Sequence, residues 1–312
     1  MKGLAKTFTI STFLFIMTTT AVMSFDRLPD LKGSDLIYGN DDRVEIDSYS
    51  NSVFIEKAKS VALRVPKKRL TTDRNDANRI LFPNVSLQNA MPQICAEEKF
   101  TEQVSLGNCS GFLVGKKTLV TAGHCMVNEK ECSDNRWVFG FKAGVTELTS
   151  SQVYSCKKII SQKYVYNNKE IGDYAVIELD REVEGYVPLK IRKFGRVLIN
   201  TPLVVIGHPM GLPMKATDGG RVSRMNDIER ETKFKSFLLR SDYFTANLDA
   251  YAGNSGSPVF NKRNGNVEGI LIQGAEDFIF NPEKECLESR KLSNSHLNTY
   301  EKVMRINKVP GL

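Results

Sequence analysis

The chain has 312 residues, of which 41% are hydrophobic and 25% are charged, and it carries a formal net charge of +7. This is an ordinary globular composition. The chain is long enough to fold without depending on disulfides or a structural metal, and it has room for two units that each form a hydrophobic core. The basic residues are scattered rather than interleaved with aromatic residues on one face, so nucleic acid is not expected as a partner.

Residues 1–24 differ from the rest and have the pattern of a secretory signal peptide. Lys2 and Lys6 form a positive start, residues 8–17 are mostly apolar, and small residues follow up to Ser24, after which cleavage is expected. The alternative is an uncleaved transmembrane anchor, which needs about 20 apolar residues, whereas threonines and serines interrupt this run. We therefore expect a secreted or periplasmic protein with no membrane span after signal cleavage.

The remainder of the chain divides by composition. Residues 25–60 are polar and acidic and are expected to form a leader or irregular arm, part of it a candidate propeptide. Short runs rich in β-branched and aromatic residues follow, such as "CSGFLVG", "YAVIEL" and "VEGILIQG", with turn signals between them. This pattern predicts an all-β sandwich or barrel. Only "LNTYEKVMRI", residues 297–306, has helical periodicity, which predicts one short C-terminal helix.

Six cysteines in an exported chain predict up to three disulfides, and their spacing leaves all 15 connectivities open. They fit no zinc pattern, so no metal site is expected. Residues 40–43 and 73–78 are acidic but lack the ligand spacing of a calcium loop, and we interpret them as solvated loops. The basic run at residues 67–69 is also interpreted as a solvated loop, with a processing site as the alternative.

Three separate motifs contain the residue types that nucleophilic catalysis requires: a nucleophile, a base, a carboxylate that orients the base, and donors for an oxyanion. Ser255 lies between glycines in "AGNSGSPVF", where the N–H groups of Gly253 and Ser255 are candidate oxyanion donors. A side chain at Gly253 would crowd a substrate or forbid the backbone angles. His124 in "LVTAGHC" is the candidate base, and Asp173 in "GDYAVIELD" is the candidate carboxylate, with Asp180 as a less well placed rival.

The motifs "TAGHC", "DYAVIEL" and "GNSGSPVF", in this order, resemble the His, Asp and Ser blocks of the trypsin/chymotrypsin superfamily of serine proteases. The separations, 173 − 124 = 49 and 255 − 173 = 82, are of the size found in that family. "GNSGSPVF", together with "LIYGNDDR" and "IGHPMGLP", is most similar to the bacterial glutamyl-endopeptidase and exfoliative-toxin branch.

The resemblance implies two perpendicular six-stranded antiparallel β-barrels, expected over residues 61–195 and 196–312, with the triad in the cleft between them. It implies that His124 is the general base, Asp173 its orienting partner and Ser255 the nucleophile that forms an acyl-enzyme. It also implies a Cys109–Cys125 disulfide beside the histidine. A monomer that cleaves protein or peptide substrates without a cofactor is expected.

The pattern departs from the family at several positions. Asn254 stands where trypsin-like zymogens have an aspartate that pairs with a new N-terminal amine, so another start of the mature chain, near residues 36–37, is expected. Asp249, Leu271 and Gly274 are the candidate substrate-binding residues. Asp249 lies six residues before Ser255, where it would bind a basic side chain or instead hydrogen-bond loop amides. Leu271 stands near the histidine of glutamyl endopeptidases, which argues against a glutamate preference.

The sequence also bears on two other functional classes. A catalytically silent homologue that only binds protein through the cleft is the main alternative, and a collapsed oxyanion loop would produce it with all three triad residues in place. An esterase of another fold is excluded, because the chain has no GxSxG elbow and no alternating helices.

Overall fold

The structure is a computed structural model that describes residues 37–166, 171–224, 242–274, 277–292 and 301–312. The described residues belong to one compact unit, residues 32–312. The predicted signal peptide lies outside them, and the predicted start of the mature chain, near residues 36–37, falls at their N-terminal boundary. None of the described helices has the length and apolar character needed to cross a membrane.

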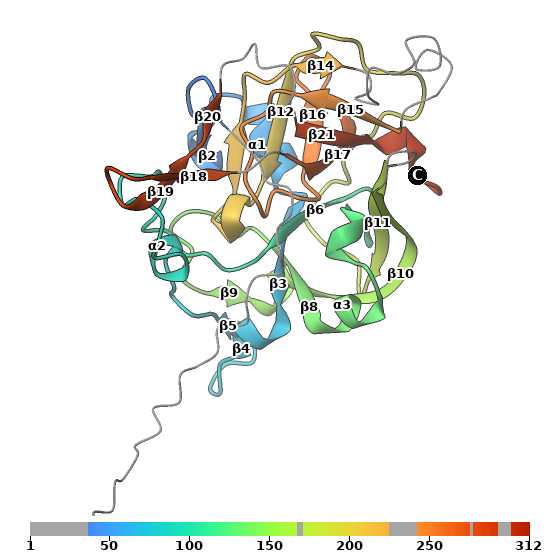
Figure 1. Ribbon diagram of the computed structural model, residues 1–312. Coiled ribbons are helices and arrows are strands. Elements are labelled where there is room, and N and C mark those ends of the chain that lie inside the picture. Colours follow the sequence, from blue (N-terminus) through green and yellow to red (C-terminus); the bar gives the residue numbers. More distant parts are fainter. Residues whose placement is uncertain (1–36, 167–170, 225–241, 275–276, 293–300) are drawn as a thin grey trace, which may run out of the picture. The chain divides into compact units, whose positions relative to one another are not determined.

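The first half of the chain forms a closed six-stranded β-barrel in which every neighbouring pair is antiparallel (Figure 1). Most of its strands are almost continuously buried, as in the "CSGFL" strand, which explains their β-branched and aromatic composition. The long strand at residues 153–166 differs, because most of its residues are partly or fully exposed. In barrel order the strands are β10 (Val153–Tyr166), β11 (Ile171–Leu179), β7 (Thr118–Thr121), β6 (Cys109–Leu113), β3 (Val61–Pro66) and β8 (Asn135–Phe139).

The second half is an eight-stranded antiparallel sheet. In sheet order its strands are β14 (Val222–Arg224), β15 (Tyr243–Ala246), β21 (Glu301–Arg305), β17 (Val267–Gln273), β16 (Pro258–Asn261), β12 (Leu203–Gly207), β13 (Lys215–Thr217) and β2 (Arg43–Glu45). The all-β class with two β-halves is confirmed, but in the described residues the second half is not a closed six-stranded barrel. At one edge of this sheet, β2 of the N-terminal arm pairs with β13 and adds a strand.

Smaller elements surround the two halves. The short strands form three further sheets: β1 (Ile37–Tyr38) with β20 (Lys291–Leu292), β18 (Phe278–Asn281) with β19 (Cys286–Ser289), and β5 (Arg79–Leu81) between β4 (Thr71–Thr72) and β9 (Leu148–Thr149). The α-helices are α1 (Ser52–Ala58), α2 (Leu87–Ala90) and α3 (Glu129–Asp134). The 3-10 helices are η1 (Ile46–Ser48), η2 (Lys67–Arg69), η3 (Gly123–Cys125), η4 (Ser150–Gln152), η5 (Pro209–Gly211) and η6 (Ile306–Lys308).

The predicted C-terminal helix over residues 297–306 is wrong in its described part. Residues 301–305 form strand β21, which pairs with β15 on one side and β17 on the other. Two rows of interstrand hydrogen bonds and full burial of Val303 outweigh the local helical periodicity. Residues 297–300 lie outside the described part of the chain.

Hydrophobic side chains from both halves share one core. Phe54 of α1 packs edge-on against Phe260 of β16, with ring centroids 5.5 Å apart, and both belong to a cluster that includes barrel residues such as Trp137 and Phe112. Burying a large aromatic side chain contributes on the order of 2–3 kcal/mol. The arm that carries α1 is therefore part of the folded core.

The six cysteines pair as Cys109–Cys125, Cys132–Cys156 and Cys95–Cys286. The first is the pair that the family resemblance implies, and the sequence left the other two open. Cys95–Cys286 joins residues 191 positions apart. By the chain-entropy argument such a link stabilises the fold by about 5 kcal/mol, against about 3 kcal/mol for the short Cys109–Cys125 loop.

Candidate active site

His124 lies in η3, immediately after barrel strand β7. Gly123 precedes it for a steric reason, because a Cβ at that position would lie 2.0 Å from the carbonyl oxygen of Lys163 in β10. The backbone of η3 therefore packs directly on β10. In β10, Tyr164 pairs with Asp173 of β11 and places its ring 5.9 Å from the His124 ring.

Asp173 holds His124 at two points. One carboxylate oxygen, Oδ2, lies 2.7 Å from Nδ1 of the His124 ring, and the other, Oδ1, accepts the His124 backbone N–H at 2.9 Å. The Asp173 side chain is 4% exposed and that of His124 is 28% exposed. A carboxylate at Nδ1 favours the tautomer with the proton on Nδ1, which leaves Nε2 with a lone pair that can accept a proton.

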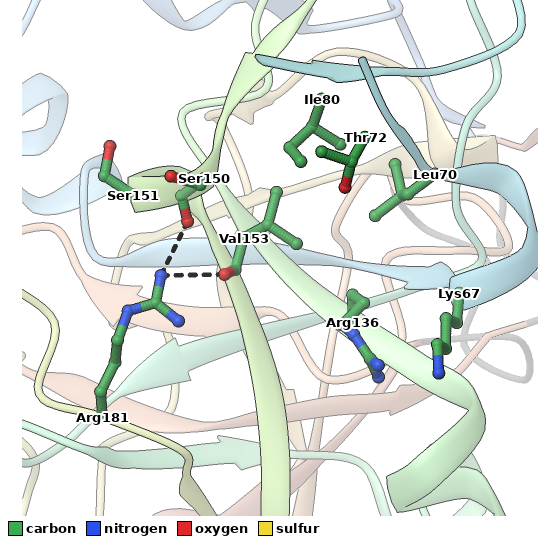
Figure 2. A pocket seen from close by; sticks show the side chains of 9 residues that line it. All are labelled: Lys67, Leu70, Thr72, Ile80, Arg136, Ser150, Ser151, Val153 and Arg181. Atoms are coloured by element: carbon green, nitrogen blue, oxygen red, sulfur yellow. Dashed lines mark hydrogen bonds between the residues drawn. The ribbon is translucent and has the colours of Figure 1, made fainter. Parts of the chain in front are cut away.

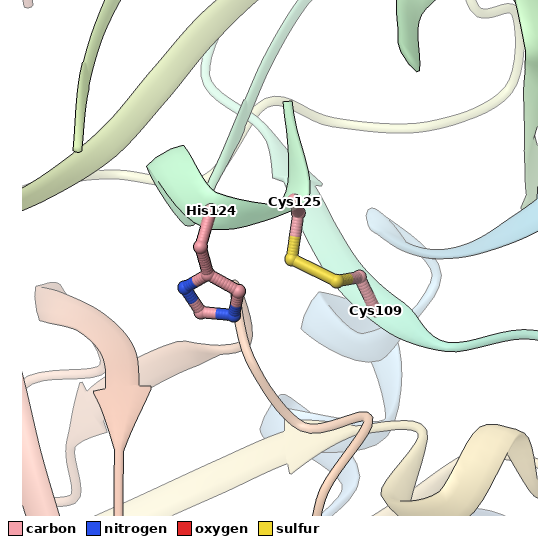
Figure 3. Close-up of side chains that lie close together, drawn as sticks. All are labelled: Cys109, His124 and Cys125. Atoms are coloured by element: carbon pink, nitrogen blue, oxygen red, sulfur yellow. A yellow bond between two sulfur atoms is a disulfide. The ribbon is translucent and has the colours of Figure 1, made fainter. Parts of the chain in front are cut away.

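The Cys109–Cys125 disulfide lies beside the imidazole of His124 (Figure 3). Cys109, His124 and Cys125 form the one cluster of potential metal ligands found in the described residues. Because both sulfur atoms are joined in the disulfide, they are not thiolates and cannot bind a metal ion. The bridge instead ties η3 to barrel strand β6.

Ser255 lies in a loop that packs against the same part of the barrel. Its carbonyl oxygen accepts the Ser110 N–H at 2.8 Å and lies 3.9 Å from Sγ of Cys125, the neighbour of His124. Gly256 has φ +88°, and a Cβ there would lie 2.0 Å from the carbonyl oxygen of Ser110. The structure thus brings the Ser255 loop next to η3. Among the described residues, no hydrogen bond joins the Ser255 hydroxyl to the His124 ring.

The backbone before Ser255 has a defined orientation. Gly253 has φ +92°, its carbonyl oxygen accepts the hydroxyl of Ser110 at 3.0 Å, and a Cβ there would lie 2.7 Å from the carbonyl oxygen of His208. The Ala252 carbonyl accepts the backbone N–H of Met210. In the described part of the chain, the N–H groups of Gly253 and Ser255 donate no hydrogen bond to any protein group. Both amides therefore lack a partner within the described protein, although Gly253 itself is buried.

Asp249 is buried against the N-terminal arm. Its two carboxylate oxygens accept the backbone N–H groups of Tyr38, at 2.7 Å, and Asp42, at 2.9 Å. Burial raises the pKa of Asp249 to about 6, although these two hydrogen bonds act in the opposite direction. Arg43 of the arm also lies 3.9 Å above the ring of Tyr251, in the same loop as Ser255. This arrangement favours hydrogen bonding to amides over a pocket for basic side chains.

Leu271 and Gly274 occupy β17 and the residue that follows it. The Leu271 side chain is 1% exposed and belongs to the core of the second half, so it faces away from solvent. Its backbone bonds to Gly256 and Ser257, which anchors the end of the Ser255 loop. Gly274 is partly exposed beyond the end of β17.

Residues 109–270 match the sequence profile of the trypsin-like peptidase domain. The chain belongs to this family. The match begins at Cys109 of β6 and includes His124, Asp173 and Ser255, which confirms the resemblance noted from the three motifs.

Two curated relatives of this trypsin-like chain come from Bacillus. A glutamyl endopeptidase of Bacillus licheniformis is 26% identical over 164 residues, 50% of this chain and 46% of the relative. A protein of Bacillus subtilis named extracellular metalloprotease is 28% identical over 168 residues, 52% of this chain and 49% of the relative. The chain thus spans about half the length of the curated relatives that it matches.

Solved structures of similar proteins include a Glu endopeptidase in complex with MPD and the VesB protease of Vibrio cholerae. The first is 15% identical, covers 86% of this chain and 93% of its own, and has a TM-score of 0.49. The second is 15% identical, covers 85% of this chain and 64% of its own, and has a TM-score of 0.49.

Several residues that hold the backbone of this candidate site could not be predicted from the sequence. Ser110 holds both the carbonyl of Gly253 and the backbone N–H of His208, yet it is an ordinary strand serine in "CSGF". Asp277 accepts the backbone N–H of Ala252 from 25 residues away. The side chain of Asn254 is buried and accepts a hydrogen bond from Ser257. Only tertiary contacts could identify these partners.

The raised pKa of Asp249 has a testable effect on stability. Because the folded chain holds this proton more tightly than an unfolded chain with a pKa near 3.8, the contribution of Asp249 to stability falls as pH rises from about 4 to about 6. Relative to Asp249→Asn, the wild type should lose about 3 kcal/mol of unfolding free energy over this interval. Denaturant unfolding at several pH values measures the difference, with Glu56→Gln on α1 as the charge control. A wild type that gains unfolding free energy relative to Asp249→Asn as pH rises would show a lowered pKa instead.

Proposed function

We propose that the protein is an exported serine endopeptidase that hydrolyses peptide bonds through Ser255, His124 and Asp173. The observation that carries the proposal is the two-point contact of Asp173 with His124, next to a loop whose Gly253 and Ser255 amides have no partner within the described chain. A polarised imidazole and open backbone donors are what acyl transfer at a serine requires.

In the proposed reaction, Nε2 of His124 takes the hydroxyl proton of Ser255 while Oγ attacks the substrate carbonyl carbon. The N–H groups of Gly253 and Ser255 then donate to the oxyanion, and the imidazolium, stabilised by Asp173, gives its proton to the leaving amine. Water repeats the sequence on the acyl-enzyme. The Ser255 hydroxyl must first turn toward the ring, since catalytic hydrogen bonds often tighten only when a substrate is bound.

The backbone of the loop favours the enzyme over a silent, protein-binding homologue. In a collapsed oxyanion loop, a carbonyl oxygen would take the place of the donors. Here the Ala252 carbonyl is bound to the Met210 N–H and the Gly253 carbonyl to the Ser110 hydroxyl, so both oxygens are already engaged elsewhere. This supports a competent oxyanion site.

The proposed substrates are proteins or peptides, with no preference assigned for a particular residue. We propose that a monomer cleaves them and that it needs no cofactor. Asp249 and Leu271 are both buried. Their burial therefore does not support a substrate pocket built on either residue, whether for basic or for acidic side chains. Gly274 remains the proposed backbone contact for an extended substrate, because it is partly exposed beyond β17.

Export is proposed from the signal-peptide pattern of residues 1–24. The three disulfides among the described residues support it, since such bonds persist in oxidising compartments. The expected division into a first half over 61–195 and a second half over 196–312 also remains a proposal.

Covalent labelling tests the proposed function directly. The purified mature protein would be treated with a biotinylated fluorophosphonate, digested and mapped by mass spectrometry. We expect a single adduct on Ser255, because only a serine activated by a base and an oxyanion site reacts rapidly with this probe. Heat-unfolded protein is the control and should not react. A correctly folded protein that stays unlabelled would contradict the proposal and favour the silent homologue.

A further inference from the structure

A cavity of about 630 Å³ lies on the first barrel, between η2, β5, β8 and the start of β10 (Figure 2). Three basic side chains line it, those of Lys67, Arg136 and Arg181. Leu70, Ile80 and Val153 contribute an apolar part, with hydroxyl side chains between them. The cavity therefore combines positive charge with an apolar surface.

The side chain of Arg181 lines this cavity and is held in place by several contacts. It donates to the carbonyl oxygens of Ser150 at 2.8 Å and Val153 at 3.0 Å, as Figure 2 shows. Its guanidinium also pairs with Asp180 and lies 3.9 Å above the ring of Tyr154. The charge of Arg181 is thus largely balanced, and its contacts hold the shape of the cavity.

The positive charges of Arg136 and Lys67 are not neutralised by an ion pair with a carboxylate of the described residues. Arg136 donates to the carbonyl oxygens of Ser133 at 3.1 Å and its neighbour Asn135 at 2.7 Å, which are neutral groups. Neither Arg136 nor Lys67 forms an ion pair with any described carboxylate. The nearby carboxyl of Asp134 belongs mainly to Lys130: the hydrogen bond from Lys130, at 2.5 Å, is the main cause that lowers the pKa of Asp134, and Lys67 adds only a small contribution. Two cations therefore remain for a ligand.

The cavity is separate from the candidate active site. Val153 at the cavity opens β10, and Tyr164 at His124 lies 11 residues later on the same strand. At roughly 3.3 Å per residue, this is about 36 Å of strand path. An extended peptide of about 10–12 residues is long enough to reach from one to the other.

We propose that this cavity binds a short acidic peptide segment that carries an apolar side chain, and that it is a docking site for protein substrates. The two unbalanced cations attract carboxylates, and the apolar part buries a side chain between them. A nucleic acid or sulfated polysaccharide is a poorer fit, because it needs a longer row of cations and has no use for the apolar surface. The docking role depends on the proposed peptidase function, whereas binding itself does not.

The test measures binding without catalysis. Ser255→Ala protein would be titrated, at low salt, into a fluorescein-labelled hexapeptide of five glutamates and one leucine, and binding followed by anisotropy. Lys67→Gln, whose side chain is exposed, and the Lys67→Gln/Arg136→Gln double variant should weaken binding, the double variant at least tenfold. Lys284→Gln, between β18 and β19, removes the same charge outside the cavity and should leave Kd unchanged.

Each other outcome has a clear meaning. Equal binding by the double variant with unchanged melting temperature overturns the proposal, as does equal binding of a glutamine-for-glutamate peptide. Tight binding of a heparin hexasaccharide without peptide binding overturns it in favour of a polysaccharide. If the peptide binds at the cavity but the wild type cleaves nothing, the proposed peptidase function fails and the binding site stands.

Discussion

Peptide hydrolysis should fall about 10⁶-fold in kcat when Ser255 is replaced by alanine, the largest effect that we expect from any single change. The variant loses the attacking oxygen, and with it the acyl-enzyme, while the amide donors of Gly253 and Ser255 remain, because they belong to the backbone. These donors and substrate binding leave a residual rate above that in water. The loss is measured with a fluorogenic peptide chosen from mass-spectrometric cleavage profiling of the wild type.

The Ser255→Ala result depends on an intact fold. Within the described residues the Ser255 side chain forms no hydrogen bond. Its loop is held through the Ser255 carbonyl and through Gly256, so the melting temperature should stay unchanged. Ser133→Ala, in α3, is the control for a serine outside the site and should keep full activity. A Ser255→Ala variant that retains more than a tenth of the wild-type kcat would mean that another group is the nucleophile.

Replacing Asp173 by asparagine should lower kcat about 10⁴-fold, which is about 5.5 kcal/mol in the activation free energy. The asparagine oxygen can still accept the His124 backbone N–H that Oδ1 now accepts at 2.9 Å. The amide group at the position of Oδ2 would donate toward Nδ1 and so favour the tautomer with the proton on Nε2. That imidazole cannot accept the proton of Ser255. Steady-state kinetics with the same fluorogenic peptide gives the ratio of kcat values.

Asp180 is the matched control for Asp173, since both carboxylates were candidates from the sequence. Asp180 accepts the backbone N–H of Ser155 at 3.1 Å and pairs with Arg181, and its side chain is 38% exposed. It has no contact with His124 among the described residues, so Asp180→Asn should change kcat less than threefold. A large loss in Asp180→Asn together with a small one in Asp173→Asn would reverse the assignment of the orienting carboxylate.

The candidate site could be predicted because its candidate catalytic residues lie in short, recognisable sequence motifs. His124 follows one glycine and Ser255 lies between two. The structure leaves no room for a side chain at these positions, as Gly123 against Lys163 and Gly256 against Ser110 show. Such close approaches of backbone to backbone leave a local mark in the sequence. The order and spacing of the motifs then predicted the family, while the short runs of β-branched and aromatic residues between turns predicted the all-β class.

Contacts between distant segments left no such mark. The helical periodicity at residues 297–306 was a local signal, and its described part became a central strand because β15 and β17 bury it from both sides. Asp249 could not be assigned from its position alone, because its carboxylate binds amides of Tyr38 and Asp42, more than 200 residues earlier in the chain. The free energy of such pairings comes from burial, which depends on the whole fold.

The sequence by itself therefore predicted the family, the residue types of the candidate site and the glycines that its backbone requires. The tertiary structure alone decided the Cys95–Cys286 and Cys132–Cys156 pairs, the place of the arm in the sheet, and the orientation of the Ser255 loop. The physical reason is range: steric and conformational limits act between neighbours in the chain, whereas burial and hydrogen bonding act between surfaces that only folding brings together.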